Sequence, residues 1–217
     1  DGIRLLAKGF HNVWMIDPGM KADDVPGPAD RTPEALAKDG PVAAAARERE
    51  LANYRATLQS GHDAEIYVKD AGGKTYRGAV WPGPCVFPDY TSPKARAWWA
   101  TLYGPFLANG MSGVWNDMNE PAIFNVASKT MPETNRHAGD PEMKKPDGSP
   151  QGEDAAGTHA RYHNVYGMQM IRGTREGILA ARPDKRPFVL SRANYIGGQR
   201  YGATWTGDNT ASWEHLE

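Results

Sequence analysis

Short apolar runs alternate with longer segments of helical spacing along this chain. The run over residues 12–16 is followed by Asp17 and then by Pro18-Gly19, a pattern typical of a buried strand that ends in a turn. A second apolar run ends at Asp117. We predict strands over 12–17, up to residue 117, over 186–192 and over 203–207.

Three segments have the spacing of helices. In the first, over 41–59, apolar or small side chains recur every three to four residues, and Pro41 suits its first turn. The second covers 92–108, with Ser92 as its N-cap and Asn109-Gly110 as its stop. The third covers 162–181 and is ended by Pro183.

The segments between these elements are polar and irregular. Residues 21–39 and 121–160 predict loops, and a loop as long as the second is usually functional or disordered. Residues 64–80 alternate around Asp70-Ala71-Gly72-Gly73, which indicates a β-hairpin. The next segment, with Trp81-Pro82-Gly83 before Cys85 and Pro88-Asp89-Tyr90 after it, is interpreted as a rigid aromatic loop.

Short apolar strands that alternate with helices predict a parallel sheet and the α/β class. The predicted strands end in Asp17, Asp117, Arg192 and Asp208, and a (β/α)8 barrel builds its active site from such strand ends. A doubly wound open sheet also binds ligands at strand ends. The absence of a glycine-rich phosphate turn from the sequence argues mildly against that alternative.

Composition narrows the possible partners. The 217 residues suffice for one domain. A net charge of −1 does not indicate binding to nucleic acid or to an acidic membrane surface. The single cysteine, Cys85, excludes an internal disulfide, and no apolar run is long enough to span a membrane. Because the chain opens without methionine and stops before a helix would cover its last strand, we expect a fragment truncated at both ends. The sequence predicts no compartment.

Two carboxylates at strand ends suggest chemistry on a sugar, since glycosidic bonds are cleaved by one ionised and one protonated carboxyl group. Asp117 is the better nucleophile candidate, because Asn116 and Asn119 could donate hydrogen bonds that keep it ionised. Trp115 could line the pocket. The alternative interpretation is an aspartate that only caps the next turn.

Asp208 is the better acid candidate. Gly207 lets the backbone approach a ligand, and Trp205 and Trp213 could withdraw the Asp208 carboxyl from water and favour its protonated form. The alternative is that Asp208-Asn209 is a simple turn. Glu120 competes for either role but is interpreted as a residue that orients the loop.

Other catalytic classes lack their signatures. The sequence contains no His-x-x-x-His pair on a helix, no Gly-x-Ser-x-Gly elbow, no Walker loop and no calcium loop. We therefore expect neither a metal nor a cofactor. Arg192 could hydrogen-bond sugar hydroxyls or hold Asp117 ionised, and a structural ion pair is an equally good interpretation.

The segments over 115–121, Trp-Asn-Asp-Met-Asn-Glu-Pro, and over 188–213, with Ser-Arg followed by Trp-Thr-Gly-Asp-Asn, resemble the two signatures of glycoside hydrolase family 31, the retaining α-glucosidases. The resemblance covers essentially the whole chain. It implies a nucleophile at Asp117, an acid/base at Asp208 and a sugar-contacting arginine at Arg192. It also implies pocket walls at Trp81, Trp115, Met118 and Trp205, with Met15 as a weaker candidate.

By the same resemblance, residues 1–217 are the central part of a (β/α)8 TIM-barrel catalytic domain, roughly its third to sixth strands, with a long insertion after the third. We therefore predict a retaining, exo-acting α-glucosidase that removes terminal α-linked glucose from oligosaccharides by double displacement. The alternatives are an α-xylosidase or transglucosidase of the same family, or a non-catalytic carbohydrate-binding module. The oligomeric state is not readable from the sequence.

Overall fold

The computed structural model describes residues 2–22 and 41–216. Most of the loop predicted over 21–39 lies outside the described residues. Lys21, at its start, belongs instead to a short strand, β2 (Met20–Lys21).

The centre of the fold is a parallel sheet of four strands in the order β1-β5-β8-β9. These strands are β1 (Asn12–Ile16), β5 (Met111–Asn116), β8 (Val189–Ser191) and β9 (Ala203–Thr204). The sheet confirms the predicted α/β class, although β8 and β9 are shorter than the predicted runs over 186–192 and 203–207. Within the described part of the chain, the sheet is open and does not close into a barrel.

The strand register aligns the predicted site residues along one edge of the sheet. Ile16 lies opposite Asn116, Asn116 opposite Ser191, and Ser191 opposite Thr204. The residues that follow these positions are Asp17, Asp117, Arg192 and Trp205. In parallel strands, side chains at matched positions project from the same face, so these four follow one another across the carboxyl edge of the sheet.

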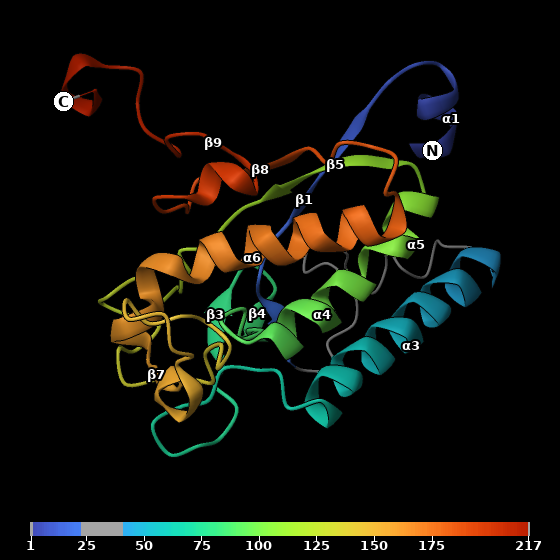
Figure 1. The fold of residues 1–217 in the computed structure, drawn as a ribbon. Coiled ribbons are helices and arrows are strands. Elements are labelled where there is room, and N and C mark those ends of the chain that lie inside the picture. Colours follow the sequence, from blue (N-terminus) through green and yellow to red (C-terminus); the bar gives the residue numbers. More distant parts are fainter. Residues whose placement is uncertain (1, 23–40, 217) are drawn as a thin grey trace.

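The two faces of the sheet differ in their surroundings. Trp14 and Ile16 of β1 pack against the main hydrophobic core, which lies between the sheet and its helices. The alternate side chains, Val13 and Met15, project from the opposite face and are 48% and 56% exposed. Figure 1 shows the long helix α6 (His159–Ala181) running along the covered face, with α4 (Pro93–Thr101) beyond it.

Helix α6 begins three residues before its predicted start and ends at the predicted residue. It packs against α4, α5 (Tyr103–Ala108) and β8. The helix predicted over 92–108 is divided at Leu102 into α4 and α5. Pro105 explains the division, because a proline ring conflicts with the carbonyl of the residue four positions earlier and removes one helical hydrogen bond. Ser92 is the N-cap by position, but its hydroxyl makes no capping hydrogen bond.

The insertion between β1 and β5 carries the 23-residue helix α3 (Pro41–Asp63) and a small antiparallel sheet, β2-β4-β3. The regular hairpin of this segment is formed by β3 (Gly78–Val80) and β4 (Gly83–Val86), with a tight turn at Trp81-Pro82. The predicted hairpin over 64–80 is reduced to one isolated bridge between Lys69 and Thr75. Cys85, expected in a loop, is instead a buried residue of β4.

The described chain also contains a short first helix, α1 (Gly2–Ala7), and a two-stranded pair formed by β6 (Arg136–His137) and β7 (Gly157–Thr158). Three turns of 3₁₀ helix cover Gly152–Ala155, Gly198–Arg200 and Trp213–His215. The long polar segment predicted over 121–160 is largely irregular, as expected, and the β6–β7 pair closes its second half.

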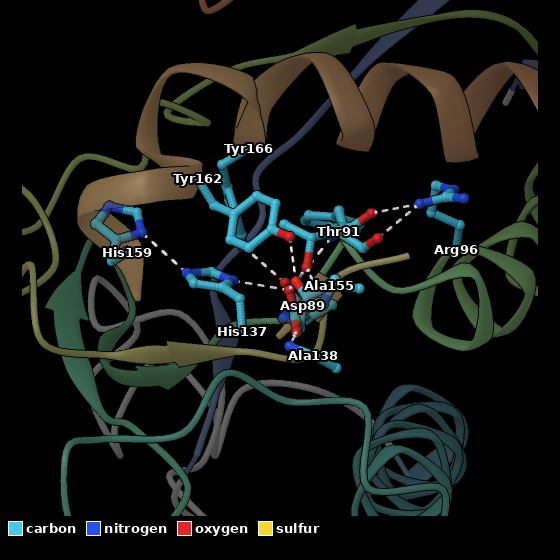
Figure 2. A network of polar contacts seen from close by, with 12 residues as sticks. Asp89, Thr91, Arg96, His137, Ala138, Ala155, His159, Tyr162 and Tyr166 are labelled. Carbon is cyan, nitrogen blue, oxygen red and sulfur yellow. Dashed lines mark hydrogen bonds and ion pairs between the residues drawn. The ribbon is translucent and has the colours of Figure 1, made fainter. Parts of the chain in front are cut away.

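A buried polar network fixes this irregular segment to the core (Figure 2). The Asp89 carboxylate accepts hydrogen bonds from the Thr91 hydroxyl at 2.6 Å, from the Ala138 backbone N–H at 2.6 Å and from Nδ1 of His137 at 2.7 Å. Nε2 of His137 lies 3.0 Å from Nδ1 of His159, at the start of α6. The network therefore joins the segment before α4, strand β6 and helix α6 through side chains that are almost fully buried.

Arg96 extends the same network. Its Nη1 donates to the backbone oxygens of Tyr90 and Thr91, each at 3.0 Å, and its Nη2 pairs with Asp140 at 3.0 Å. Tyr166 of α6 donates to the Pro88 carbonyl at 2.8 Å. An arginine with this many fixed acceptors holds the segment after β6 against α4.

The network makes stability depend on pH through His159. Burial, followed by repulsion from His137 and His163, lowers the pKa of His159 from 6.5 to about 3. Below pH 6.5, His159 is protonated in the unfolded chain but stays neutral in the folded chain. The free energy of unfolding therefore falls as the pH decreases. We expect the melting temperature of the complete protein to drop between about pH 6.5 and 4.5, with up to about 1.4 kcal/mol lost per pH unit from this group.

The variant His159→Gln should weaken this dependence, since an amide still reaches His137 but takes up no proton. The exposed His11→Gln is the matched control and should follow the wild type. Thermal unfolding of the three proteins across this pH range is the measurement, and equal slopes for His159→Gln and the wild type would contradict the assignment.

Candidate active site

Asp117 directly follows β5 and is 9% exposed. The next residue, Met118, has a positive φ of 57°, so the chain turns sharply as it leaves the sheet. This turn brings the side chains of Met118 and Glu120 back beside the end of β8. Asp117, Met118 and Glu120 therefore all contact one arginine.

That arginine is Arg192, which follows β8. Its Nε donates to Oε1 of Glu120 at 2.6 Å and lies 3.3 Å from Oδ1 of Asp117. Its Nη1 donates to Oδ2 of Asp208 at 2.9 Å, and its Nη2 lies 3.2 Å from the Met118 sulfur. One guanidinium thus contacts both predicted catalytic carboxylates, although they come from different strands.

The charges around Arg192 keep it ionised. Burial lowers its pKa, but the hydrogen bond to Glu120 and the charges of Glu120, Asp117 and Asp208 outweigh this effect, so the pKa of Arg192 is raised. Glu120 was expected to orient the loop. In the structure its carboxylate also accepts the hydrogen bond from the single N–H of Arg192 Nε. Arg192 acts as the fixed positive charge of the site.

The hydrogen bonds predicted from Asn116 and Asn119 to Asp117 are not formed. Asn116 donates to the Ile16 carbonyl at 3.2 Å, which ties β5 to β1. Asn119 donates to the Gly167 carbonyl of α6 at 3.3 Å and accepts from the Ser191 hydroxyl at 2.9 Å. The reason is the alternation of side chains along a strand: Asn116 faces the helices, whereas Asp117 faces the opposite side.

Asp208 lies on the loop after β9, and its side chain is 79% exposed. Gly207 precedes it with a φ of +97°, a conformation that suits glycine, and packs beside the Arg192 side chain. The predicted withdrawal of Asp208 from water by Trp213 is wrong for the described residues, since Trp213 is itself 80% exposed. Among the described residues, Arg192 is the group that binds and orients Asp208.

The predicted pocket walls divide into two groups. Met118 contacts Arg192, and the Trp115 and Trp205 rings meet edge to face with centroids 5.4 Å apart. Met15 lies opposite Trp115 in the register and is exposed on the open face of the sheet. Trp81 belongs to the separate β3–β4 hairpin, where it is 71% exposed and packs edge-on against Phe124.

Asp17 was predicted to end a strand at the active-site edge, but no role was predicted for it. Burial and the charges of Asp117 and Glu120 raise the pKa of Asp17, Arg192 opposes them, and the net effect is a pKa of about 6. Its Oδ1 is buried and makes no hydrogen bond to any described residue. The signal was present in the sequence, because Asp17 ends an apolar run in the same way as Asp117, but only the β1–β5 register places the two side by side.

No group of three or more histidine, cysteine or acidic side chains in residues 2–22 and 41–216 is arranged to hold a metal ion. Over the same part of the chain, none of the helices combines the length and apolar character that crossing a bilayer requires.

Comparison with known proteins identifies the family. Residues 3–217 match the model of the Glycosyl hydrolases family 31 TIM-barrel domain. Alpha-glucosidase 2 of Bacillus thermoamyloliquefaciens is 37% identical over 213 residues, which is 98% of this chain and 22% of that protein. Neutral alpha-glucosidase AB of Sus scrofa is 43% identical over 156 residues, 70% of this chain and 15% of that protein.

Solved structures agree. The family 31 alpha-glucosidase from Bacteroides thetaiotaomicron has 42% identity and a TM-score of 0.62, over 99% of this chain and 27% of that one. The glucosidase II alpha subunit has 31% identity and a TM-score of 0.67, over 99% of this chain and 19% of that one. The chain thus spans about a fifth of the length of these relatives. With nearly every residue matched by the family's barrel domain, this chain belongs to glycosyl hydrolase family 31.

Proposed function

We propose that this chain is the central part of a (β/α)8 catalytic domain and contributes the reacting carboxylates of a retaining α-glucosidase. The observation that supports it best is the pair of contacts that Arg192 makes with Asp117 and Asp208. Paired carboxyl groups on one site are what hydrolysis of a glycoside requires. The activity of the relatives named above points to terminal α-linked glucose of an oligosaccharide as the substrate.

In the first step, a carboxylate oxygen of Asp117 attacks the anomeric carbon of the glucose. The glycosidic bond breaks with its electron pair going to the leaving oxygen, which takes the proton of Asp208. The product is a β-glucosyl ester of Asp117. Arg192 holds both carboxyl groups in place, and the near-complete burial of Asp117 limits its access to water before the sugar arrives.

In the second step, Asp208 takes a proton from a water molecule, whose oxygen attacks the same carbon. The ester bond breaks with its electrons returning to Asp117, and glucose leaves with the α-configuration. Two inversions give net retention. Because carboxylates supply both the nucleophile and the proton, this mechanism needs no metal or cofactor.

The pocket for the glucose ring would lie on the open face of the sheet. Met15, Trp115 and Trp205 project there or border it, and Arg192 and Met118 close its edge. Trp81, on the β3–β4 turn, would approach from the insertion. On this face, the apolar side chains Val13 and Met15 of β1 are 48% and 56% exposed. Apolar side chains like these fill the interior of a complete barrel.

The test is the stereochemical course of hydrolysis by the complete protein. An aryl α-glucoside is mixed with the enzyme, and proton NMR follows which anomer of glucose forms first. Early α-glucose supports the proposal, and early β-glucose contradicts it. Faster turnover of an aryl α-xyloside would favour an α-xylosidase, transfer to added glucose would favour a transglucosidase, and binding without turnover would favour a carbohydrate-binding module.

A further inference from the structure

Asp17 and Asp117 are neighbours on adjacent parallel strands. The β1–β5 register pairs Met15 with Trp115 and Ile16 with Asn116, so the next position places Asp17 beside Asp117 at the end of the two strands. Met15 and Trp115 lie on the open face, and the period of two puts both aspartates on that side as well. Two carboxyl groups therefore share one partly buried edge.

Each of these carboxyl groups carries an oxygen without a donor. Oδ1 of Asp17 and Oδ1 of Asp117 are both buried, and neither receives a hydrogen bond from a described residue. Nε of Arg192 lies 3.3 Å from Oδ1 of Asp117, but its single N–H is directed to Glu120 at 2.6 Å. Buried carboxylate oxygens without donors are costly, and one shared proton would satisfy both.

The charges nearby favour this arrangement. The groups that act on Asp17 are Asp117 and Glu120 from the loop after β5 and Arg192 from the end of β8, which also pairs with Asp208. One guanidinium faces several carboxyl groups, so a further negative charge at Asp17 would be poorly compensated. Burial and the Asp117 charge raise the pKa of Asp17 to about 6, in agreement with a carboxyl group that keeps its proton.

We propose that Asp17 is a positioning residue for the nucleophile, a protonated carboxyl group whose O–H donates to Asp117 and fixes its orientation. The inference rests on the proposed function. The proton stays on Asp17 through both chemical steps. It is donated first to the oxygen of the Asp117 carboxylate that does not attack, and then to the carbonyl oxygen of the glucosyl ester. Because the groups interact, the titration belongs to the pair rather than to either residue.

Two substitutions of Asp17 distinguish the hydrogen bond that it donates from the space that its side chain fills. In the complete protein, Asp17→Asn keeps an N–H donor at every pH, and we expect kcat to fall about tenfold because a neutral amide is a weaker donor than a carboxylic acid. Asp17→Ala has no donor, and kcat should fall about 100-fold, the cost of a misplaced reacting group, with a much smaller change in KM. Equal kcat values for the two variants would overturn the proposal.

The pH profile provides a readout that a purely structural role would not change. Above about pH 6, wild-type Asp17 loses its proton and a second anion repels Asp117, so kcat/KM declines as Asp17 ionises. Asp17→Asn lacks this ionisation, so the decline of kcat/KM near pH 6 should disappear. The fully exposed Asp147→Asn is the matched control and should reproduce the wild-type profile.

An unchanged alkaline limb in Asp17→Asn would overturn the proposal. A measurement independent of turnover is the infrared difference spectrum of the wild type minus Asp17→Asn. It should contain a carboxylic acid carbonyl band that disappears as the pH rises through about 6. If neither variant folds, the same titration is followed on the wild type alone, and absence of the band would overturn the proposal. Failure of the wild type to hydrolyse α-glucosides would instead overturn the proposed function.

Discussion

Replacing Asp117 with alanine should abolish turnover, with kcat lower by about 10⁴-fold or more, because the variant lacks the carboxylate that forms the glucosyl ester. Asp117 is buried beside the fixed charge of Arg192, which holds its carboxylate in place. Binding of substrate should change far less, since the sugar-facing aromatic side chains remain. Steady-state rates on an aryl α-glucoside, with KM measured alongside, test this expectation.

Added azide gives the same variant a diagnostic product. The cavity left by the Asp117 side chain admits a small anion to the same face of the sugar, so azide should restore part of the rate and give β-glucosyl azide through a single inversion. Asp147→Ala, far from the charge cluster and fully exposed, is the control and should behave as the wild type. Turnover by Asp117→Ala within a few fold of the wild type would exclude Asp117 as the nucleophile.

The main architecture could be predicted from the sequence because periodicity reports which side chains are buried. The apolar run before Asp17 and the run before Asp117 both became parallel strands, and the helical spacing after Tyr162 became most of α6. Local departures from these patterns were harder to predict from the sequence. Pro105 divides one predicted helix, and pairing through Cys85 builds β4 where composition alone indicated a loop.

The contacts within the site could not be predicted from the sequence, because they depend on the strand register and on the direction in which each side chain projects. Asp117, Arg192 and Asp208 could be chosen because each follows a strand, and the structure brings all three together. Asn116 and Asn119 lie within two positions of Asp117 in the sequence, yet they bind backbone carbonyls of other elements. Proximity along the chain therefore gave the wrong hydrogen-bond partners for Asp117. The β1–β5 pairing instead places Asp17, which is distant in the sequence, beside Asp117.

Replacing Asp208 with alanine should produce a loss that depends on the leaving group. General acid catalysis is worth about 10² to 10⁴-fold, so hydrolysis of an unactivated α-glucoside should slow by about 10³-fold. A dinitrophenyl glucoside needs no protonation of its leaving oxygen, and formation of the glucosyl ester from it should be almost unaffected. The ester should then accumulate, because Asp208 is also the base that activates water, and a burst of released phenol should precede a slow steady state.

Azide should distinguish the two aspartates by the anomer that it forms. In Asp208→Ala, Asp117 still forms the ester, and azide, which needs no base, attacks it with a second inversion to give α-glucosyl azide. The opposite anomer is expected from Asp117→Ala, although Arg192 contacts both residues. The β-azide from Asp208→Ala, or equal losses on good and poor leaving groups, would mean that the proton comes from another group. Glu120, hydrogen-bonded to the same guanidinium, would then be the next residue to substitute.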